Sequence, residues 1–232
     1  PGYTYVPDDN FEQALIELGF DDTLDNFVAT DSINSVTDLD VSNDSISDLT
    51  GIEGFTALTE LDCSENQLTN LDMSNNTALN ILYCYRNQLT ALNVSSNTAL
   101  STLYCYRNQL TALDVSNNTS LVNFDGSSNQ LTSFNVSQNI PLLILSVGNN
   151  QLTSLDVSSN TALTYLSCWS NLLTSLDVSA NTALTILGGT ANELTALDVS
   201  ANTALTKLYF GQNQLTTLDL SANTSLDDVR AY

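Results

Sequence analysis

The chain has 232 residues, of which 26 are acidic and 4 are basic, and its formal net charge at pH 7 is −22. This balance excludes nucleic acid and anionic membrane surfaces as partners, because binding to phosphate groups needs clustered lysine and arginine side chains. No apolar run approaches the roughly 18 residues of a membrane-spanning helix, and no signal peptide is present, so we expect no membrane insertion.

Residues 1–35 are expected to form a small helical N-terminal cap. Four apolar residues recur at the spacing of one helix face: Phe11, Ala14, Leu15 and Leu18. This spacing predicts an amphipathic helix over residues 7–19. Asp8 or Asp9 would cap the first turn and Gly19 would end the helix. We expect the helix to cover the N-terminal end of the hydrophobic core.

A degenerate first repeat occupies residues 36–57, and regular repeats follow over residues 58–232. The first offset is 22 residues, with Leu39 equivalent to Leu61, and later offsets are 21 residues. The chain ends inside a further repeat, whereas arrays normally finish with a polar capping repeat. We therefore expect a truncated array without a C-terminal cap, belonging to a longer protein.

Each regular repeat has two halves, the first with the pattern LxxLxCxxN and the second with the pattern xLTxLDVSxNTA. Self-similarity at a fixed period of this length indicates a solenoid. Ten or eleven residues per half leave room for a strand and a turn but little for a helix. The pattern predicts a mostly β solenoid with two parallel sheets, one per half, joined by short turns.

These motifs carry a family resemblance. The LxxLxCxxNxL core matches the leucine-rich-repeat signature, and the second half resembles the nested 21-residue subclass found in secreted and surface proteins of bacteria. The opening YVPDDNFEQALIELG, together with ISDLTGIEGFTAL, is similar to the cap and first repeat of those proteins. The resemblance implies a leucine-rich-repeat solenoid, a secreted or cell-surface location and a role in adhesion or recognition. It does not name the ligand, which differs between members.

The four cysteines occupy one inward slot of the repeat, and they are Cys63, Cys84, Cys105 and Cys168. Elsewhere the same slot holds Gly126, Val147, Gly189 and Phe210, so it is a packing position. Unpaired cysteine behaves as a small apolar residue, and we expect buried free thiols. Disulfides or a cysteine-ligated metal are the alternatives, but the close CxxC spacing of a zinc site is absent.

Two asparagine columns follow the strands, one containing Asn66 and the other containing Asn76. An inward asparagine at a turn can hydrogen-bond backbone groups of its own and the neighbouring rung, which predicts a structural role.

A third column is acidic and contains Asp156, Asp177, Asp198 and Asp219 on successive rungs. Parallel rungs lie about 4.8 Å apart, where two carboxylates repel by roughly 1 kcal/mol even in water. Hydrogen bonds from the serine two residues on would account for the column, and bound Ca²⁺ is the weaker alternative. Equal melting temperatures in EDTA and in millimolar Ca²⁺ would exclude calcium, and no other cofactor is expected.

Side chains flanking the cysteine slot alternate outward and form the candidate ligand-binding face. The candidates are Tyr83, Tyr85, Arg86, Tyr104, Tyr106, Arg107, Tyr165, Trp169, Lys207 and Tyr209. Tyrosine, tryptophan and arginine dominate binding hot spots, and this face varies between rungs while the second-half face stays rich in Asp and Ser. Cross-strand tyrosine stacking without a ligand is the alternative, and LYCYRNQLTAL occurs twice, so its tyrosines and arginines count as one observation.

Catalysis has little support, because the chain has no histidine, no GxSxG motif and no glycine-rich phosphate loop. We therefore expect no enzyme.

The favoured hypothesis is an extracellular or cell-surface recognition or adhesion module whose variable first-strand face binds a protein ligand, such as a host or neighbour surface component. A glycan ligand and a structural spacer within a larger surface protein are the alternatives.

Overall fold

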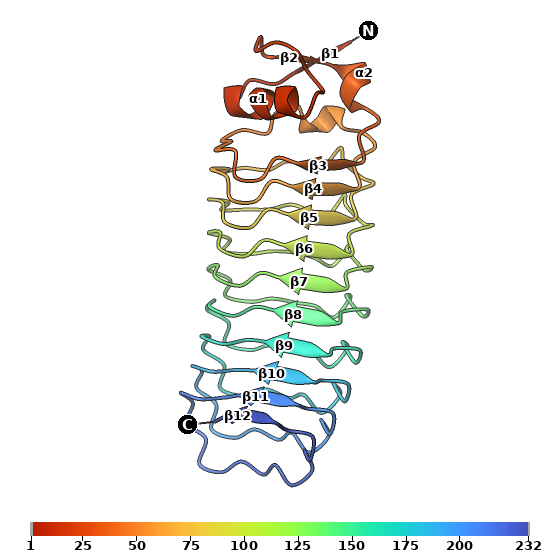
Figure 1. The fold of residues 1–232 in the computed structure, drawn as a ribbon. Helices are drawn as coiled ribbons and strands as arrows, with labels where there is room; N and C mark the ends of the chain where they lie inside the picture. Colours follow the sequence, from red (N-terminus) through yellow and green to blue (C-terminus); the bar gives the residue numbers. More distant parts are fainter. Residues whose placement is uncertain (1, 232) are drawn as a thin grey trace.

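The computed structural model describes residues 2–231 and shows a solenoid whose rungs stack along one parallel sheet (Figure 1). The ten strands of this sheet are β3 (Asp38–Asp40), β4 (Glu60–Asp62), β5 (Ile81–Tyr83), β6 (Thr102–Tyr104), β7 (Asn123–Asp125), β8 (Ile144–Ser146), β9 (Tyr165–Ser167), β10 (Ile186–Gly188), β11 (Lys207–Tyr209) and β12 (Asp228–Arg230). They follow one another in sequence order, because each repeat packs only on its neighbours. The expected leucine-rich-repeat solenoid is confirmed.

The repeat period sets the strand register. Leu39 pairs with Leu61 across the longer first offset, and Leu61 pairs with Leu82 across the first regular one. Equivalent residues therefore lie side by side along the whole sheet, and every inward side chain contacts its own equivalents on the two neighbouring rungs.

The core is a column of apolar side chains between the two halves of each rung. In one rung the buried set is Leu100, Leu103, Cys105, Leu110, Leu113 and Val115. All but Leu113 are fully buried, and Leu113 retains 9% exposure. The second half of the rung therefore closes the core slightly less completely than the first half.

The cysteines lie in this core as free, fully buried thiols, as expected. Burial raises the pKa of Cys168 to about 12 and raises that of Cys63 further. These thiols are therefore protonated and apolar in character at neutral pH, since the thiolate is the reactive form.

The expected second parallel sheet is not present. Within residues 2–231 the second halves contribute only an isolated bridge between Asp72 and Asn93. The reason is that side chains take the backbone groups a sheet would use: the N–H of Ser74 donates to the Asp72 carboxylate at 2.9 Å, and the Asn97 amide donates to the carbonyl of Met73 at 3.0 Å. The second half is extended, but its hydrogen bonds are made by turns and side chains.

Both asparagine columns have the expected structural role. In the first column, Asn87 donates to the carbonyls of Cys63 and Cys84 and accepts from the N–H of Leu68. In the second, Asn118 is fully buried and donates to the carbonyls of Val94 at 3.0 Å and Asn97 at 2.8 Å. Each asparagine thus connects neighbouring rungs through hydrogen bonds from its buried side chain to the backbone.

The N-terminal cap contains the expected helix, α1 (Asp9–Glu17), with Asp8 as its N-cap. Gly19 follows the helix with a φ of +80°, a conformation that favours glycine. Leu18, expected on the buried face, is 46% exposed because the helix ends one residue earlier. The cap also contains elements that the sequence did not predict: the antiparallel pair β1 (Tyr3–Tyr5) and β2 (Phe27–Ala29), and the short helix α2 (Thr30–Ile33).

Asp8 also joins the cap to the first repeat. One carboxylate oxygen accepts from the N–H groups of Asn10 and Phe11, and the other accepts from the N–H and hydroxyl of Ser47. Burial alone would raise the pKa of Asp8, but these hydrogen bonds outweigh it and lower the pKa. A 3₁₀ turn, η1 (Ile52–Gly54), completes this junction.

Among residues 2–231, no helix is long and apolar enough to cross a membrane.

Candidate functional site

The outward side chains of β4 to β12 and of the turn after each strand form one continuous surface, which we call the variable face. Along β5, Leu82 and Cys84 point into the core, while Ile81, Tyr83 and Tyr85 alternate with them and are half-buried. The alternation follows from the period of two in extended backbone. Tyr83, Tyr85 and their equivalents on the next rung therefore lie on the face predicted for them.

Four tyrosines on β5 and β6 pack against one another in two pairs. The rings of Tyr85 and Tyr106 are stacked, with centroids 4.5 Å apart and an interplanar angle of 5°. The rings of Tyr83 and Tyr104 lie 5.3 Å apart at 42°. Burial raises the pKa of Tyr83, and the nearby Glu60 carboxylate raises it further. The pairs form a rigid aromatic platform, and they also supply the cross-strand stabilisation that was the alternative explanation.

Arg86 and Arg107 lie at the edge of the face rather than on the strands. Each occupies a left-handed turn, with φ of +53° and +55°, and the same conformation recurs at Ser128 and Asn149. The turn directs the next residue, an asparagine of the first column, back into the core. Arg86 forms an ion pair with Glu65 at 2.9 Å, whereas Arg107 has no ion-pair partner within the described residues.

Trp169 and Tyr165 form a second aromatic group, three rungs from β6 and four from β5. Trp169 is 40% exposed, and its indole lies directly over Gly148 of the preceding rung, where a Cβ atom would lie 2.1 Å from its Nε1. Gly148 therefore makes the position of this ring possible. Within the described residues Trp169 makes no ring stacking contact, so more of its aromatic surface is open than that of the tyrosine pairs.

A hollow of about 280 Å³ lies between these two aromatic groups. Its walls are Tyr104 of β6 and Tyr165 of β9, and Asp125, Ile144 and Ser146 line the space between them. The Asp125 carboxylate accepts from the N–H of Ser127 at 2.9 Å. Asp125, Ile144 and Ser146 were not among the predicted site residues, although the alternation pattern places them on the outward side of their strands. Aspartate, isoleucine and serine side chains give no hot-spot signal of their own, and the hollow exists only because both tyrosine walls are in place.

The third predicted group, Lys207 and Tyr209, is held by the following strand. The Tyr209 hydroxyl donates to Asp228 at 2.8 Å, and the Arg230 guanidinium lies 5.2 Å from the centre of the Tyr209 ring. The hydrogen bond to Asp228 raises the pKa of Tyr209. Lys207 is exposed and pairs in register with Asp228. This group is the least available of the three for an external partner.

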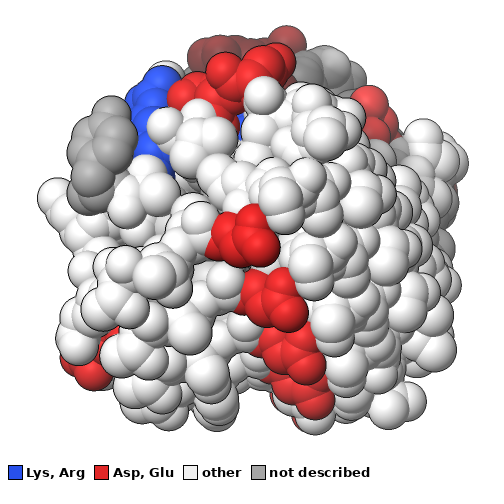
Figure 2. Space-filling view, turned by 90° about the horizontal axis from the view of Figure 1, so that it is seen from below, with Lys and Arg blue, Asp and Glu red and all other residues white. Residues whose placement is uncertain are grey.

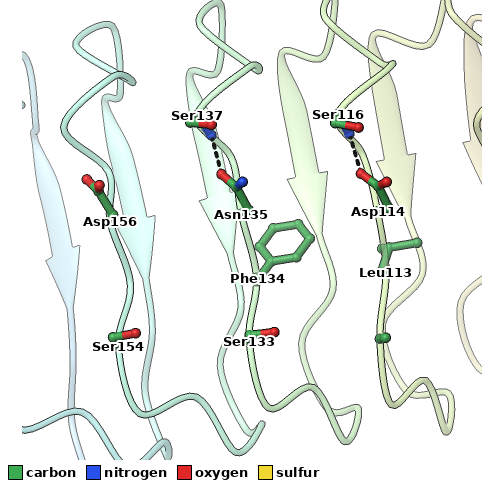
Figure 3. A pocket seen from close by; sticks show the side chains of 10 residues that line it. Leu113, Asp114, Ser116, Ser133, Phe134, Asn135, Ser137, Ser154 and Asp156 are labelled. Carbon is green, nitrogen blue, oxygen red and sulfur yellow. Dashed lines mark hydrogen bonds between the residues drawn. The ribbon is translucent and has the colours of Figure 1, made fainter.

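The second-half face carries a hollow of about 770 Å³. Figure 3 shows its lining, in which Phe134 lies between hydroxyl and carboxylate side chains of three adjacent rungs. Asp114 and Asn135 accept from the N–H groups of Ser116 and Ser137, each at 2.9 Å. These residue types recur on every rung, so the hollow is one stretch of a repeating surface, with Phe134 replacing the usual leucine.

The acidic column lies on this face, and Figure 2 shows acidic side chains following one another in a row on the molecule seen from below. Asp156 and Asp177 each accept from the N–H of the serine two residues on, at 2.9 Å. These hydrogen bonds are the expected main explanation for the column. Within residues 2–231, no three acidic or cysteine side chains converge as a metal-binding group. The assignment of calcium to Asp156, Asp177, Asp198 and Asp219 therefore rests on the column alone and stays a prediction.

Two substitutions of Asp177 measure separately how its hydrogen bonds with Ser179 and its repulsion by Asp156 and Asp198 affect stability. Hydrogen bonds from the side chain and N–H of Ser179 lower the pKa of Asp177, against repulsion by Asp156 and Asp198. Asn93 occupies the same slot and keeps the serine hydrogen bond at 3.0 Å. We therefore expect Asp177→Asn to change the melting temperature little at pH 7 and Asp177→Ala, which removes the acceptor, to lower it more.

The lowered pKa of Asp177 defines how its contribution to stability changes with pH. Because the folded pKa lies below the ordinary 3.8, the stabilisation from the ionised carboxylate is present above that value and is lost as pH falls through the folded pKa. The small difference in melting temperature between the wild type and Asp177→Asn at pH 7 should therefore shift toward the variant as pH falls, as measured by thermal denaturation between pH 7 and pH ~2. A clearly more stable Asn variant at pH 7 would instead show that repulsion dominates.

No protein-family model matches the chain. A curated relative, internalin J of Listeria monocytogenes serotype 4b (strain F2365), is 42% identical over 76 residues, which are 32% of this chain and 8% of that protein. The chain therefore spans a small part of this relative's length.

Solved structures resemble a larger part of the chain. The functional domain of InlJ from Listeria monocytogenes, which includes a cysteine ladder, has 34% identity and a TM-score of 0.59, and the match covers 99% of this chain and 61% of that domain. A leucine-rich-repeat protein of Leptospira interrogans has 24% identity and a TM-score of 0.74 over 78% of this chain and 50% of that one. Internalin C2 of Listeria monocytogenes, at 20% identity and a TM-score of 0.74, covers 97% of this chain and 93% of its own and shares the fold.

Proposed function

We propose that this chain, a leucine-rich-repeat protein of the bacterial type, is a secreted or cell-surface recognition module that binds a protein ligand on its variable face. The anchors are the tyrosine platform of β5 and β6 and the Tyr165–Trp169 group. Arg86 and Arg107 supply charged contacts at the edge. Leucine-rich-repeat arrays of this kind generally act as non-enzymatic binding scaffolds, and the similarity to internalin J supports a role in protein interaction or adhesion.

The observation that carries this proposal is the contrast between the two faces. The second-half face repeats the same Asp and Ser side chains, whose hydrogen bonds are used within their own turns. The variable face changes from rung to rung and exposes rigid aromatic rings beside a hollow. Large rigid rings lose little conformational entropy on binding, which makes them effective anchors.

The acidic surface adds selectivity for the ligand. Only four basic residues oppose 26 acidic ones, so a basic or neutral protein surface would approach the face more readily than an acidic one. The open aromatic surface of Trp169 favours a direct role in binding over a purely stabilising one, since this ring stacks on no other ring of the described chain.

Alanine substitutions of the aromatic anchors test the proposal. We expect Tyr104→Ala and Trp169→Ala each to weaken ligand capture by about tenfold, because truncated hot-spot residues typically cost more than ~1 kcal/mol. Tyr3→Ala is the matched control, since Tyr3 is 69% exposed on the cap, away from the variable face. The measurement is quantitative capture of extracellular proteins by the immobilised chain, with a glycan array probed in parallel.

The outcomes separate the three functions. Proteins retained by the wild type and by Tyr3→Ala, but lost by the two anchor variants, would support the proposal. Glycan binding with the same dependence on Tyr104 and Trp169 would replace the protein ligand by a carbohydrate. Unchanged capture by all variants would favour a structural spacer. Circular dichroism should show that each variant remains folded.

A further inference from the structure

The hollow between Tyr104 and Tyr165 has a chemistry of its own. Its two walls are aromatic, one lining side chain, Ile144, is aliphatic and 36% exposed, and the acidic group among the lining residues is Asp125. The walls lie three rungs apart, which separates their backbones by roughly 14 Å at the usual strand spacing. The rungs between them contribute the short side chains Asp125 and Ser146, so the space between the rings is left open.

The Asp125 carboxylate is held in place but is not neutralised. The N–H of Ser127 fixes one of its oxygens at 2.9 Å, and the hydroxyls of Ser127 and Ser146 are hydrogen-bonded to each other at 2.9 Å. Ion pairs within residues 2–231 join Arg86 to Glu65 and Arg230 to Asp228, and neither involves Asp125. The carboxylate is therefore presented between two aromatic walls, and no cationic side chain of residues 2–231 lies within ion-pair distance of it.

The size of the hollow limits what can enter. About 280 Å³ lies just below the roughly 300–1,000 Å³ of pockets that enclose drug-sized ligands. It is therefore suited to a single side chain rather than to an oligosaccharide or a cofactor. Long basic side chains fit the lining, since their methylene groups can pack on Ile144 and the rings while the cationic end reaches the carboxylate.

We infer that this hollow is a specificity pocket for one arginine or lysine side chain of the protein ligand, with Asp125 as the selecting residue. The inference rests on the proposed function and names the chemistry of the partner at one point of the face. The tyrosine platform and Trp169 supply apolar contact area around the pocket, and Asp125 selects a positive charge within it. A ligand with an acidic or neutral side chain at this point would leave the carboxylate desolvated without a partner.

A small probe tests the pocket independently of the natural ligand. N-acetyl-arginine amide is titrated into the isotope-labelled chain at low salt, and N-acetyl-citrulline amide, which has nearly the same shape without the charge, is the control. We expect the arginine probe to shift the amide resonances of Asp125, Ser127, Ser146 and Tyr165 in the millimolar range. We expect these shifts to weaken as sodium chloride is added.

Two variants identify the selecting residue. Asp125→Asn keeps an acceptor for the Ser127 N–H, as Asn135 does for the Ser137 N–H at 2.9 Å. It should weaken binding of the arginine probe about fivefold, because a half-exposed charge contact contributes a modest free energy. Asp62→Asn is the matched control, since Asp62 occupies the same slot on β4 and likewise accepts from the N–H of Ser64 at 2.9 Å, but has Asp40 rather than a tyrosine on one side.

Unchanged arginine binding in Asp62→Asn together with the loss in Asp125→Asn would support the pocket. Equal binding of the arginine and citrulline probes, equal binding by wild type and Asp125→Asn, or no arginine shifts at all would overturn it. The proposed function would survive those results if Tyr104→Ala and Trp169→Ala still weakened ligand capture about tenfold. Conversely, arginine binding at the pocket without any protein capture would leave the pocket standing and remove the proposed function.

Discussion

Asn139→Ala is expected to lower the free energy of unfolding by about 1–3 kcal/mol, because it removes two buried hydrogen bonds that each contribute roughly 0.5–1.5 kcal/mol. Asn139 is fully buried, and its amide donates to the carbonyls of Val115 and Asn118, both at 2.9 Å. Alanine removes both hydrogen bonds between the two rungs, and the carbonyls keep only the turn hydrogen bonds from the N–H groups of Asn118 and Leu121. Urea denaturation followed by circular dichroism measures the change.

The neighbouring Gln138→Ala is the matched control for this substitution. Gln138 is exposed, and its amide contacts only the Ser137 side chain, at 3.5 Å. Its replacement should change stability by less than ~0.5 kcal/mol, as surface substitutions usually do. Equal effects at the two positions would show that the asparagine column does not hold the rungs together. Because equivalent asparagines recur on every rung, the same loss is expected at Asn118 or Asn160.

Gly126→Val is expected to destabilise the fold by about 3 kcal/mol, at the upper end of the usual cost of overpacking a core. A Cβ atom at Gly126 would lie 2.7 Å from Cζ of Phe124, a fully buried ring that stacks on Phe134 with centroids 4.7 Å apart. At this separation the Phe124 ring, its stack on Phe134 or the backbone must shift. The loss is measured by urea denaturation.

The next rung provides the compensating change. There the equivalent pair is Leu145 and Val147, both fully buried. The double variant Phe124→Leu/Gly126→Val reproduces that pair and should recover most of the stability lost by Gly126→Val alone. A double-mutant cycle with Phe124→Leu gives the coupling energy. Additive effects of the two substitutions would show that the glycine is not required by the phenylalanine ring.

Much of the fold could be predicted from the repeat. The period identified the solenoid, and the offset of Leu39 to Leu61 gave the register that the strands adopt. The alternation around the cysteine slot separated Cys84 in the core from Tyr83 and Tyr85 on the surface. These properties are local or repeat once per rung, so a single sequence contains them in full.

The candidate site could be predicted only in part. The tyrosines lie on the expected face and stack in the cross-strand pairs that were the alternative explanation. The sequence did not indicate that Arg86 and Arg107 sit in left-handed turns at the edge of this face. The hollow was missed because it depends on two tyrosines three rungs apart with short side chains between them. Assignment of the variable face to ligand binding remains a prediction that the anchor variants test.

The sequence by itself determined which residues stack, because a fixed period places every side chain beside its own equivalents. Tertiary structure decided which donor and acceptor form each hydrogen bond and which side chains pack against one another. Within residues 2–231 the second halves form no sheet, because the Asp72 side chain accepts from the Ser74 N–H and the Asn97 side chain donates to the Met73 carbonyl. Sequence pattern and propensity do not show which of these partners a backbone group will take. Likewise, Trp169 lies over Gly148 and Asp125 lies between two aromatic walls because of neighbours one or more rungs away, whose ring orientations follow from packing in three dimensions.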